Sequence, residues 1–479
     1  MRASFCWVTF HLMLASAGGA QRPALGPDTR KYVSVDAPVV ALTNVTIIDG
    51  TGTPPRSGQT ILISGNRIQA VGAEGVVAVP AGATVIDLTG HTVIPGLMGM
   101  HDHMFYTTPG SSEVQSNFSF PKLYLASGVT SVRTTGSFSP YAELSLKAGI
   151  ERGDVPGPRM HITGPYLISL GPDARLDLLG MHEVSTEAAA RRVVRTWAEE
   201  GAEWIKVYTQ ITPEIFKVVV DEAHKHGMKV TGHLCSISFS EAAELGIDNI
   251  EHGLRTNSDY DPSKRSGSCP PTHFETLGRL DMNDSRVAKT LRTMIEHGVP
   301  MTTTAVNEQL APHRPGPDVR TLEAMAPWIA EQETSRRAHL DLPTPIGEIY
   351  PHMGEIYPKS QQFELAFVKA GGVLAAGVDP AFAALAGFGN QRNLELLVEA
   401  GFTVPQAIQI MTSNGAKILG VQKDLGTVEA GKIADLVVIR GDLMANPAAI
   451  YQTVTVFKDG YGYDSARLLA VVKGQVGIH

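Results

Sequence analysis

Residues 92–103 read TVIPGLMGMHDH, an apolar run that ends in two histidines separated by one residue. A short run of Val, Ile, Leu and Met is typical of a buried strand, and alternate residues of a strand point to the same side. His101 and His103 can therefore converge on one ion, because neutral imidazole is a good ligand for Zn²⁺ and related metals. A lone pair of this kind is also common by chance, so the rest of the chain must decide.

Further runs rich in Val, Ile and Thr follow, separated by helical patterns. They cover 129–136, 160–166, 204–210, 229–234, 249–254, 300–306 and 373–380. Strands that alternate with helices favour parallel pairing and right-handed crossovers. The chain therefore predicts an α/β fold, a closed (β/α)8 TIM barrel over residues 93–423. An open doubly wound sheet is the alternative, but its Gly-x-Gly-x-x-Gly fingerprint is absent.

The two ends of the chain have a different pattern. Residues 37–92 alternate and turn like a β-meander, and similar runs at 433–439 and 453–457 lie within residues 424–479. We expect both ends to meet in one small β-sandwich domain. The segment 307–360 is too long for an ordinary loop, and we expect a lid or a helical insertion there.

The first residues resemble a targeting segment. Arg2 is followed by a short apolar run and by small residues before Gln21, so residues 1–20 are interpreted as a cleaved signal peptide. This predicts a periplasmic or secreted protein, with no membrane span in the mature chain. Of the three Cys, Cys235 and Cys269 would remain, either paired or as separate thiols.

The composition excludes several kinds of partner. With 43% hydrophobic and 18% charged residues the chain is globular, and a net charge of −8 without a basic cluster argues against nucleic acid or anionic membranes. We expect a small-molecule substrate, and a homo-oligomer is left open.

More metal-binding side chains follow the predicted strands. His233 ends the fifth run, His252 the sixth, and Asp379 the eighth. The chemistry of such barrels gathers at the carboxyl ends of the strands, so these residues would share one rim with His101 and His103. Unrelated structural placements are the alternative, but each would need its own hydrogen-bond partner in an apolar interior.

Lys206 lies inside the apolar fourth run, where a bare ammonium is costly to bury. It either pairs with a carboxylate, reaches water, or is converted to an anion that bridges two cations.

With these motifs in place, the chain resembles the amidohydrolase superfamily of metal-dependent hydrolases. The matching residues are Pro95-Gly96-Leu97, His101, His103, Lys206, His233, His252, Asp379 and the segment 426–436. The resemblance is closest to the branch of imidazolonepropionase-like proteins, Xaa-Pro dipeptidases and ochratoxin-type amidases. Met98-Gly99-Met100 departs from the Asp-containing stretch of many relatives, and we expect no change in ligation from it.

The resemblance implies a centre of two divalent metal ions, usually zinc. It assigns His101, His103 and Asp379 to the first metal and His233 and His252 to the second. Lys206 would bridge them as N6-carboxylysine, a carboxylated lysine.

The implied activity is hydrolysis of a C–N amide bond in a small peptide-like or N-acyl amino acid substrate, as an amidohydrolase or peptidase. A metal-bridging hydroxide would attack, and Asp379 would act as general base and then acid. A cyclic amide or lactone hydrolase could use the same centre, and a non-catalytic metal- or ligand-binding barrel is the alternative outside enzymes.

The predicted substrate-binding residues are Tyr106, Arg133, His161 and Tyr208, which lie at or just past the first four runs. Arg133 could hold a carboxylate, or make a salt bridge at the barrel end. We also expect a flexible mouth loop at Gly387–Gly389, and solvent-exposed positions for His273, His313 and His352.

Overall fold

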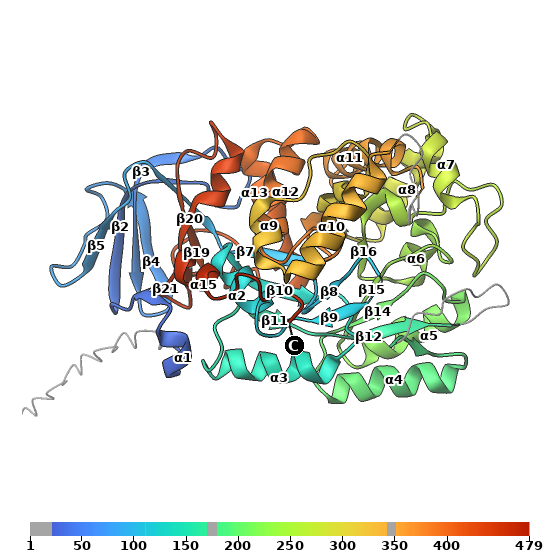
Figure 1. Cartoon of the computed structure of the whole chain (residues 1–479), viewed down its shortest axis with the longest axis horizontal. Helices are drawn as coiled ribbons and strands as arrows, with labels where there is room; N and C mark the ends of the chain where they lie inside the picture. The colour runs from blue at the N-terminus through green and yellow to red at the C-terminus, as the bar shows by residue number, and fades with distance from the viewer. Residues whose placement is uncertain (1–21, 111, 170–179, 343–350, 479) are drawn as a thin grey trace, which may run out of the picture.

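The computed structural model describes residues 22–110, 112–169, 180–342 and 351–478. The chain forms a mixed α/β structure in which parallel strands are surrounded by helices, and a further sheet built from both chain ends lies at one end of the molecule (Figure 1). The predicted signal peptide lies outside the described residues.

Among the described residues the strands that alternate with helices form two parallel sheets, and each predicted run overlaps at least one of these strands. The first sheet has the order β11 (Arg159–His161), β10 (Val129–Thr134), β7 (Leu97–Asp102). The second has the order β13 (His182–Glu183), β12 (Thr163–Ile168), β14 (Trp204–Val207), β15 (Lys229–Gly232), β16 (Asn249–Glu251), β17 (Met301–Thr303), β18 (Leu374–Ala376).

The strand pairings therefore differ from the predicted single closed barrel. The two sheets still meet at their edges through backbone contacts. The amides of Val378 and Asp379, just past β18, donate to the carbonyl oxygen of His101 in β7 at 2.9 and 2.7 Å. Near the other edge, Ser137 and Pro165 form a parallel bridge.

Helices alternate with the parallel strands, and several begin where the sequence predicts. In α5 (Pro213–Lys225) the hydroxyl of Thr212 accepts from the amide of Ile215, with proline in the first turn. The others in this part are α2 (Phe120–Ala126), α3 (Pro140–Glu151), α4 (Glu187–Glu199), α6 (Phe239–Leu245), α7 (His273–Arg279), α8 (Ser285–Glu296), α12 (Phe388–Glu399), α13 (Val404–Met411) and α14 (Ser413–Leu419). Short 3-10 helices are η1 (Gly253–Thr256), η2 (Ala305–Leu310) and η3 (Pro447–Gln452).

Most of the described part of the segment 307–360 is helical. It contains α9 (Val319–Ala324), α10 (Pro327–Leu340) and the start of α11 (Met353–Lys369), while 343–350 lies outside the described residues. In contrast, the prediction of a flexible mouth loop at Gly387–Gly389 is wrong. Gly387 (φ 77°) begins α12, and a Cβ there would lie 2.3 Å from the carbonyl oxygen of Leu123, so close packing explains the glycine.

Both chain ends contribute to the end sheet, which has nine strands in the described part of the chain. Its order is β1 (Val33–Val35), β21 (Tyr461–Asp464), β20 (Thr453–Lys458), β19 (Leu436–Arg440), β6 (His91–Pro95), β2 (Val39–Ile47), β3 (Arg56–Ser64), β4 (Arg67–Ala73), with β5 (Thr84–Asp87) paired to β2. Hydrogen bonds thus join in one sheet the strands that were expected to form a two-sheet sandwich. The sheet has its own apolar cluster, which includes Val40, Leu42, Ile61 and Leu436.

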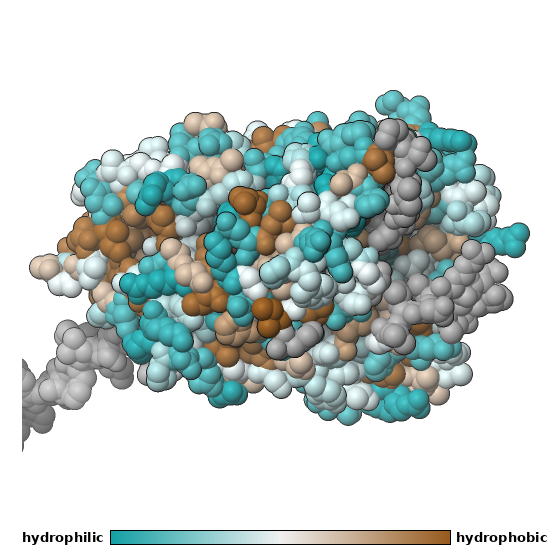
Figure 2. All heavy atoms as spheres, viewed as in Figure 1, coloured by the Kyte–Doolittle hydropathy of each residue, from teal (hydrophilic) through white to brown (hydrophobic). Residues whose placement is uncertain are grey.

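The remaining elements are small. They are the hairpin of β8 (Phe105–Thr107) and β9 (Glu113–Gln115), α1 (Pro27–Arg30) and α15 (Ser465–Ala470). On the face drawn in Figure 2, hydrophobic residues gather over the end sheet, while hydrophilic residues predominate elsewhere. None of the described helices is long and apolar enough to cross a membrane.

Candidate metal centre

The predicted ligands come together beyond the carboxyl ends of the parallel strands. The carboxylate of Asp379 lies between three imidazoles: its Oδ1 is 3.7 Å from Nε2 of His101 and 3.3 Å from Nε2 of His103, and its Oδ2 is 3.7 Å from Nδ1 of His252. His233 packs against His252 with ring centroids 4.3 Å apart. Ligand atoms of His101, His252 and Asp379 lie within 4.8 Å of one another, a spacing that suits one ion.

Two of the imidazoles are oriented by hydrogen bonds from the far side of the ring. Nδ1 of His101 lies 2.8 Å from Oε2 of Glu251, and Nδ1 of His103 lies 3.1 Å from the carbonyl oxygen of Gly136. Because these oxygens can only accept, each Nδ1 carries the proton and each Nε2 keeps its lone pair. In both rings that lone pair belongs to the nitrogen facing Asp379, as metal ligation requires.

His252 has different surroundings. Its Nδ1 lies 2.9 Å from Nη2 of Arg255 and 3.1 Å from Oγ1 of Thr304. The guanidinium of Arg255 therefore lies directly beside the predicted metal centre and adds positive charge to it.

The backbone at this site is unusual. His252 (φ 70°) and Asp379 (φ 54°) both adopt the left-handed region, which costs a residue with a side chain roughly 1–3 kcal/mol. Gly377 lies where β18 passes β7, and a Cβ there would be 2.3 Å from the amide nitrogen of His101. The fold thus holds Asp379 against the histidines in a conformation that local preferences disfavour.

Burial favours the neutral form of His101, His233 and His252, while Asp379 stays charged. Burial lowers the pKa of His101 to about 4 and those of His233 and His252 well below the ordinary value. Burial alone would raise the pKa of the Asp379 carboxyl, but the adjacent His101 and His103 hold it well below its usual range. Neutral imidazoles beside a carboxylate are the protonation states that bind a cation.

Lys206 in β14 is 1% exposed, and within the described residues its Nζ has no hydrogen-bond partner. Burial lowers its pKa to about 8, although Glu251 and Asp379 act in the opposite direction. A buried cation without hydrogen bonds is costly, whereas an amine carboxylated to an anion would be paired with cations. This orphaned atom, together with the imidazoles and the carboxylate, fits a divalent metal centre.

Above the ligands lies a cavity of about 430 Å³. His101, Lys206, His233, His252 and Asp379 all line it. The volume is within the range of about 300–1,000 Å³ that is usual for small-molecule sites. The centre is therefore accessible to a small ligand.

Of the predicted substrate residues, Tyr208 lines this cavity, and Tyr106, Arg133 and His161 do not. The Tyr106 hydroxyl donates to Glu333 and accepts from the amide of Ala383. Arg133 pairs with Glu251 at 2.5 Å, and Nδ1 of His161 lies 2.6 Å from Glu203. The three side chains that do not line the cavity are thus bound to other residues. Arg133 therefore forms a salt bridge, which was the alternative to binding a substrate carboxylate.

Several lining residues were missed. Phe105 and Thr107 face the cavity in place of Tyr106, and the i, i+2 rule applied from His103 would have indicated Phe105. Glu251 does not line the cavity, but an acidic residue in an apolar run directly before His252 indicates a buried ion pair. Tyr166 ends the third predicted run and Arg255 directly follows the sixth, so the rule of strand ends could have indicated both.

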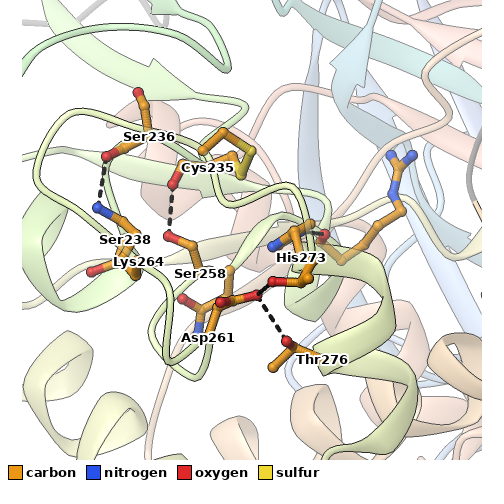
Figure 3. The surroundings of a disulfide bond; sticks show 12 residues. Cys235, Ser236, Ser238, Ser258, Asp261, Lys264, His273 and Thr276 are labelled. Atoms are coloured by element: carbon orange, nitrogen blue, oxygen red, sulfur yellow. Dashed lines mark hydrogen bonds between the residues drawn. A yellow bond between two sulfur atoms is a disulfide. The ribbon is translucent and has the colours of Figure 1, made fainter. Parts of the chain in front are cut away.

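The structure joins Cys235 and Cys269 in a disulfide with a Cα–Cα distance of 4.9 Å, which decides between the two alternatives (Figure 3). The bond ties the residue two positions after His233 to the segment before α7, and both cysteines line the cavity. His273 is the first residue of α7. It is buried, with Nε2 2.7 Å from the carbonyl oxygen of Arg255, so the expectation of a solvent-exposed position was wrong for it.

Comparisons with known proteins agree with this geometry. The family model described as "Amidohydrolase family" matches residues 92–343 and 359–461. The enamidase of Eubacterium barkeri is 26% identical over 198 residues, 41% of this chain and 50% of the enamidase, so the chain spans half the length of this relative.

Solved structures show the same fold. A Xaa-Pro dipeptidase with bound methionine has a TM-score of 0.65 at 22% identity, over 89% of this chain and all of that chain. The ochratoxinase of A. niger has a TM-score of 0.61 at 18% identity, over 90% of this chain and 96% of that one. At these identities the likeness concerns the fold alone.

Proposed function

The chain belongs to the amidohydrolase family, a family of hydrolases acting on C–N bonds, and from this premise we propose that it hydrolyses an amide in a small peptide-like or N-acyl amino acid substrate. The observation that carries the proposal is the convergence of His101, His233, His252, Asp379 and the orphaned Lys206 on the floor of one cavity, with His103 beside Asp379. No serine nucleophile motif Gly-x-Ser-x-Gly is present in the sequence to suggest another route.

The centre would hold two divalent cations, zinc by its donor set. His101, His103 and Asp379 would bind the first, His233 and His252 the second, and Lys206 would join them as its carbamate. When bound, such cations lower the pKa of a water molecule and polarise an amide carbonyl.

Asp379 is the proton carrier in this proposal. Its side chain is 27% exposed and lines the cavity, so one carboxylate oxygen can accept a proton from the attacking water. The same oxygen can then pass that proton to the departing nitrogen. In the proposed centre His101, His103 and Asp379 would share one metal, which would leave the carboxylate little freedom at the reacting atoms.

The two parallel sheets are proposed to be the wall of a (β/α)8 barrel over residues 93–423. The backbone contacts at both sheet edges, from Val378 to His101 and between Ser137 and Pro165, support closure. Residues 37–92 and 424–479 would form the second domain. With residues 1–20 as a signal peptide, we propose a periplasmic or secreted enzyme whose partner is its small substrate.

The proposal is tested with Asp379→Asn on a panel of dipeptides, N-acyl amino acids, cyclic amides and lactones. The variant should lose hydrolysis of linear amides while its melting temperature stays close to that of the unmodified protein. Asp281→Asn, at an exposed turn, is the matched control and should remain active. Full activity in Asp379→Asn would refute the mechanism, and cleavage confined to lactones or cyclic amides would favour ring opening.

A further inference from the structure

The rings around the metal centre form a closed circle. One half consists of the imidazoles of His101, His103, His233 and His252. The other half, here called the aromatic arc, consists of Phe105, Phe138, Tyr166 and Tyr208. Ring centroids along the arc lie 4.5 Å (His103–Phe105), 5.0 Å (Phe105–Phe138), 4.9 Å (Phe138–Tyr166), 5.4 Å (Tyr166–Tyr208) and 4.7 Å (Tyr208–His233) apart.

Every ring of the arc lines the cavity, although the four come from different parts of the chain. Phe105 lies in β8, Phe138 precedes α3, Tyr166 lies in β12 and Tyr208 follows β14. Tyr166 is paired in register with Lys206 of the adjacent strand, and its hydroxyl lies 3.5 Å from Nε2 of His103. The arc is thus continuous with the metal ligands at both ends.

Two glycines make room for the arc. A Cβ on Gly136 (φ 94°) would lie 2.6 Å from Cζ of Tyr166, and a Cβ on Gly180 (φ 90°) would lie 2.8 Å from Cδ1 of Phe138. No side chain could occupy either position without displacing a ring of the arc. The rings are therefore held in place before any ligand arrives, which is a requirement of a selective subsite.

Other parts of the cavity lining are also apolar or uncharged. Cys269, Pro270, Pro271 and Phe274 come from one segment and line the cavity. The disulfide joins this segment to Cys235, which also lines the cavity (Figure 3). The charged groups in the lining are Lys206, Arg255, Asp379 and Glu113. The first three lie at the proposed metal centre, and Glu113 lies on β9. The aromatic arc itself presents only ring surfaces and two phenolic hydroxyls to a ligand.

We propose that the aromatic arc binds a planar ring carried by the acyl group of the substrate, so that the preferred substrates are N-aroyl or N-arylacetyl amino acids. The carbonyl must lie at the ligands, and the arc begins directly beside them at His103 and His233. A ring attached to that carbonyl, or one carbon away, meets the arc in the offset or edge-to-face contacts that aromatic rings prefer. The inference rests on the proposed amide hydrolysis.

The test compares kcat/KM for N-benzoyl-alanine, N-cyclohexanecarbonyl-alanine and N-acetyl-alanine. The cyclohexyl compound matches the benzoyl group in size without its planarity. The protein should prefer benzoyl over either of the others by about tenfold or more, and Phe138→Leu should reduce the benzoyl-to-acetyl ratio by about tenfold. Phe118→Leu is the matched control, because Phe118 is 56% exposed and does not line the cavity.

An equal or reversed preference, or a ratio unchanged in Phe138→Leu, would overturn the inference while leaving amide hydrolysis intact. If none of these three amides is cleaved, the dipeptides of the panel still test the proposed function, and calorimetry with benzoate and cyclohexanecarboxylate tests the arc separately. Tighter binding of benzoate that is lost in Phe138→Leu would support it. Equal or absent binding of the two acids would refute it.

Discussion

Glu251 Oε2 lies 2.8 Å from Nδ1 of His101, and the other carboxylate oxygen of Glu251 pairs with Arg133 at 2.5 Å. All three side chains are buried, so the carboxylate fixes the tautomer of one predicted metal ligand while a guanidinium balances its charge. Burial would raise the pKa of Glu251, but Arg133 and His101 hold it well below its usual range. We therefore predict that Glu251 positions His101 in the proposed metal centre.

Glu251→Gln should weaken metal binding by about 10- to 100-fold, the usual effect of losing such a partner, and should lower stability by about 3–5 kcal/mol because Arg133 is left unpaired. Metal titration and thermal melting measure the two effects. Glu203→Gln is the control, since Glu203 contacts His161 in the same way at 2.6 Å but away from the cavity. Unchanged metal affinity in a folded Glu251→Gln protein would remove this role.

Lys206→Ala should reduce the number of metal ions bound per chain, because the proposed bridge is lost together with the orphaned Nζ atom. Elemental analysis of the purified variant gives the count. Lys229→Ala, on the neighbouring strand β15, removes a lysine whose Nζ donates to the carbonyl oxygen of Ile418, and should keep the full count. Two metals per chain in Lys206→Ala would contradict the carbamate.

Glu143 in α3 gives a prediction about pH. Its side chain is fully buried, and burial raises its pKa from 4.5 to about 8 against the smaller effects of Ser137 and Thr134. The folded protein therefore holds a proton that the unfolded chain releases near pH 4.5, so stability falls as pH rises through this window.

Glu143→Gln should abolish this loss, which is on the order of 4 kcal/mol when the carboxyl is fully ionised. Melting temperatures of the two proteins should agree near pH 4 and diverge in favour of the variant above pH 8. Coincident melting curves at both pH values would show that Glu143 does not titrate in this way.

The disulfide joins residues 34 apart. A crosslink of this loop length stabilises a protein by about 3–4 kcal/mol through the unfolded chain, and here it also anchors a segment of the cavity lining. Cys235→Ser combined with Cys269→Ser should lower the melting temperature and raise KM. Adding a reductant to the unmodified protein should reproduce both changes and leave the double variant unaffected; insensitivity of the unmodified protein would contradict the prediction.

The convergence of the proposed ligands was predictable because each follows a short apolar run, and parallel strands bring their carboxyl ends together. His101, His233, His252 and Asp379 follow from this rule and from the motif of the family. The rule does not say which side chains are already committed to other partners. Arg133 was chosen as a residue that could hold a carboxylate, yet its partner Glu251 lies on a strand 118 residues away.

The aromatic arc and the packing of Gly387 could not be predicted from the sequence, because both depend on contacts between residues that lie far apart in the chain. Contacts between Phe105, Phe138 and Tyr166 depend on how separate strands are rotated about a shared cavity, which periodicity does not encode. A glycine in a stretch such as 381–389 is compatible with either a loop or a close approach, and only the position of the Leu123 carbonyl oxygen beside Gly387 distinguishes the two.

The central claim is tested most directly by removing and restoring the metal. The purified protein is stripped with a chelator, its metal content is measured, and its rate on N-acyl amino acids is recorded before and after Zn²⁺ is added back. We predict a loss of at least about 100-fold in rate on stripping and recovery as two ions per chain are restored. A metal-free chain that hydrolyses these amides at the original rate would contradict the account.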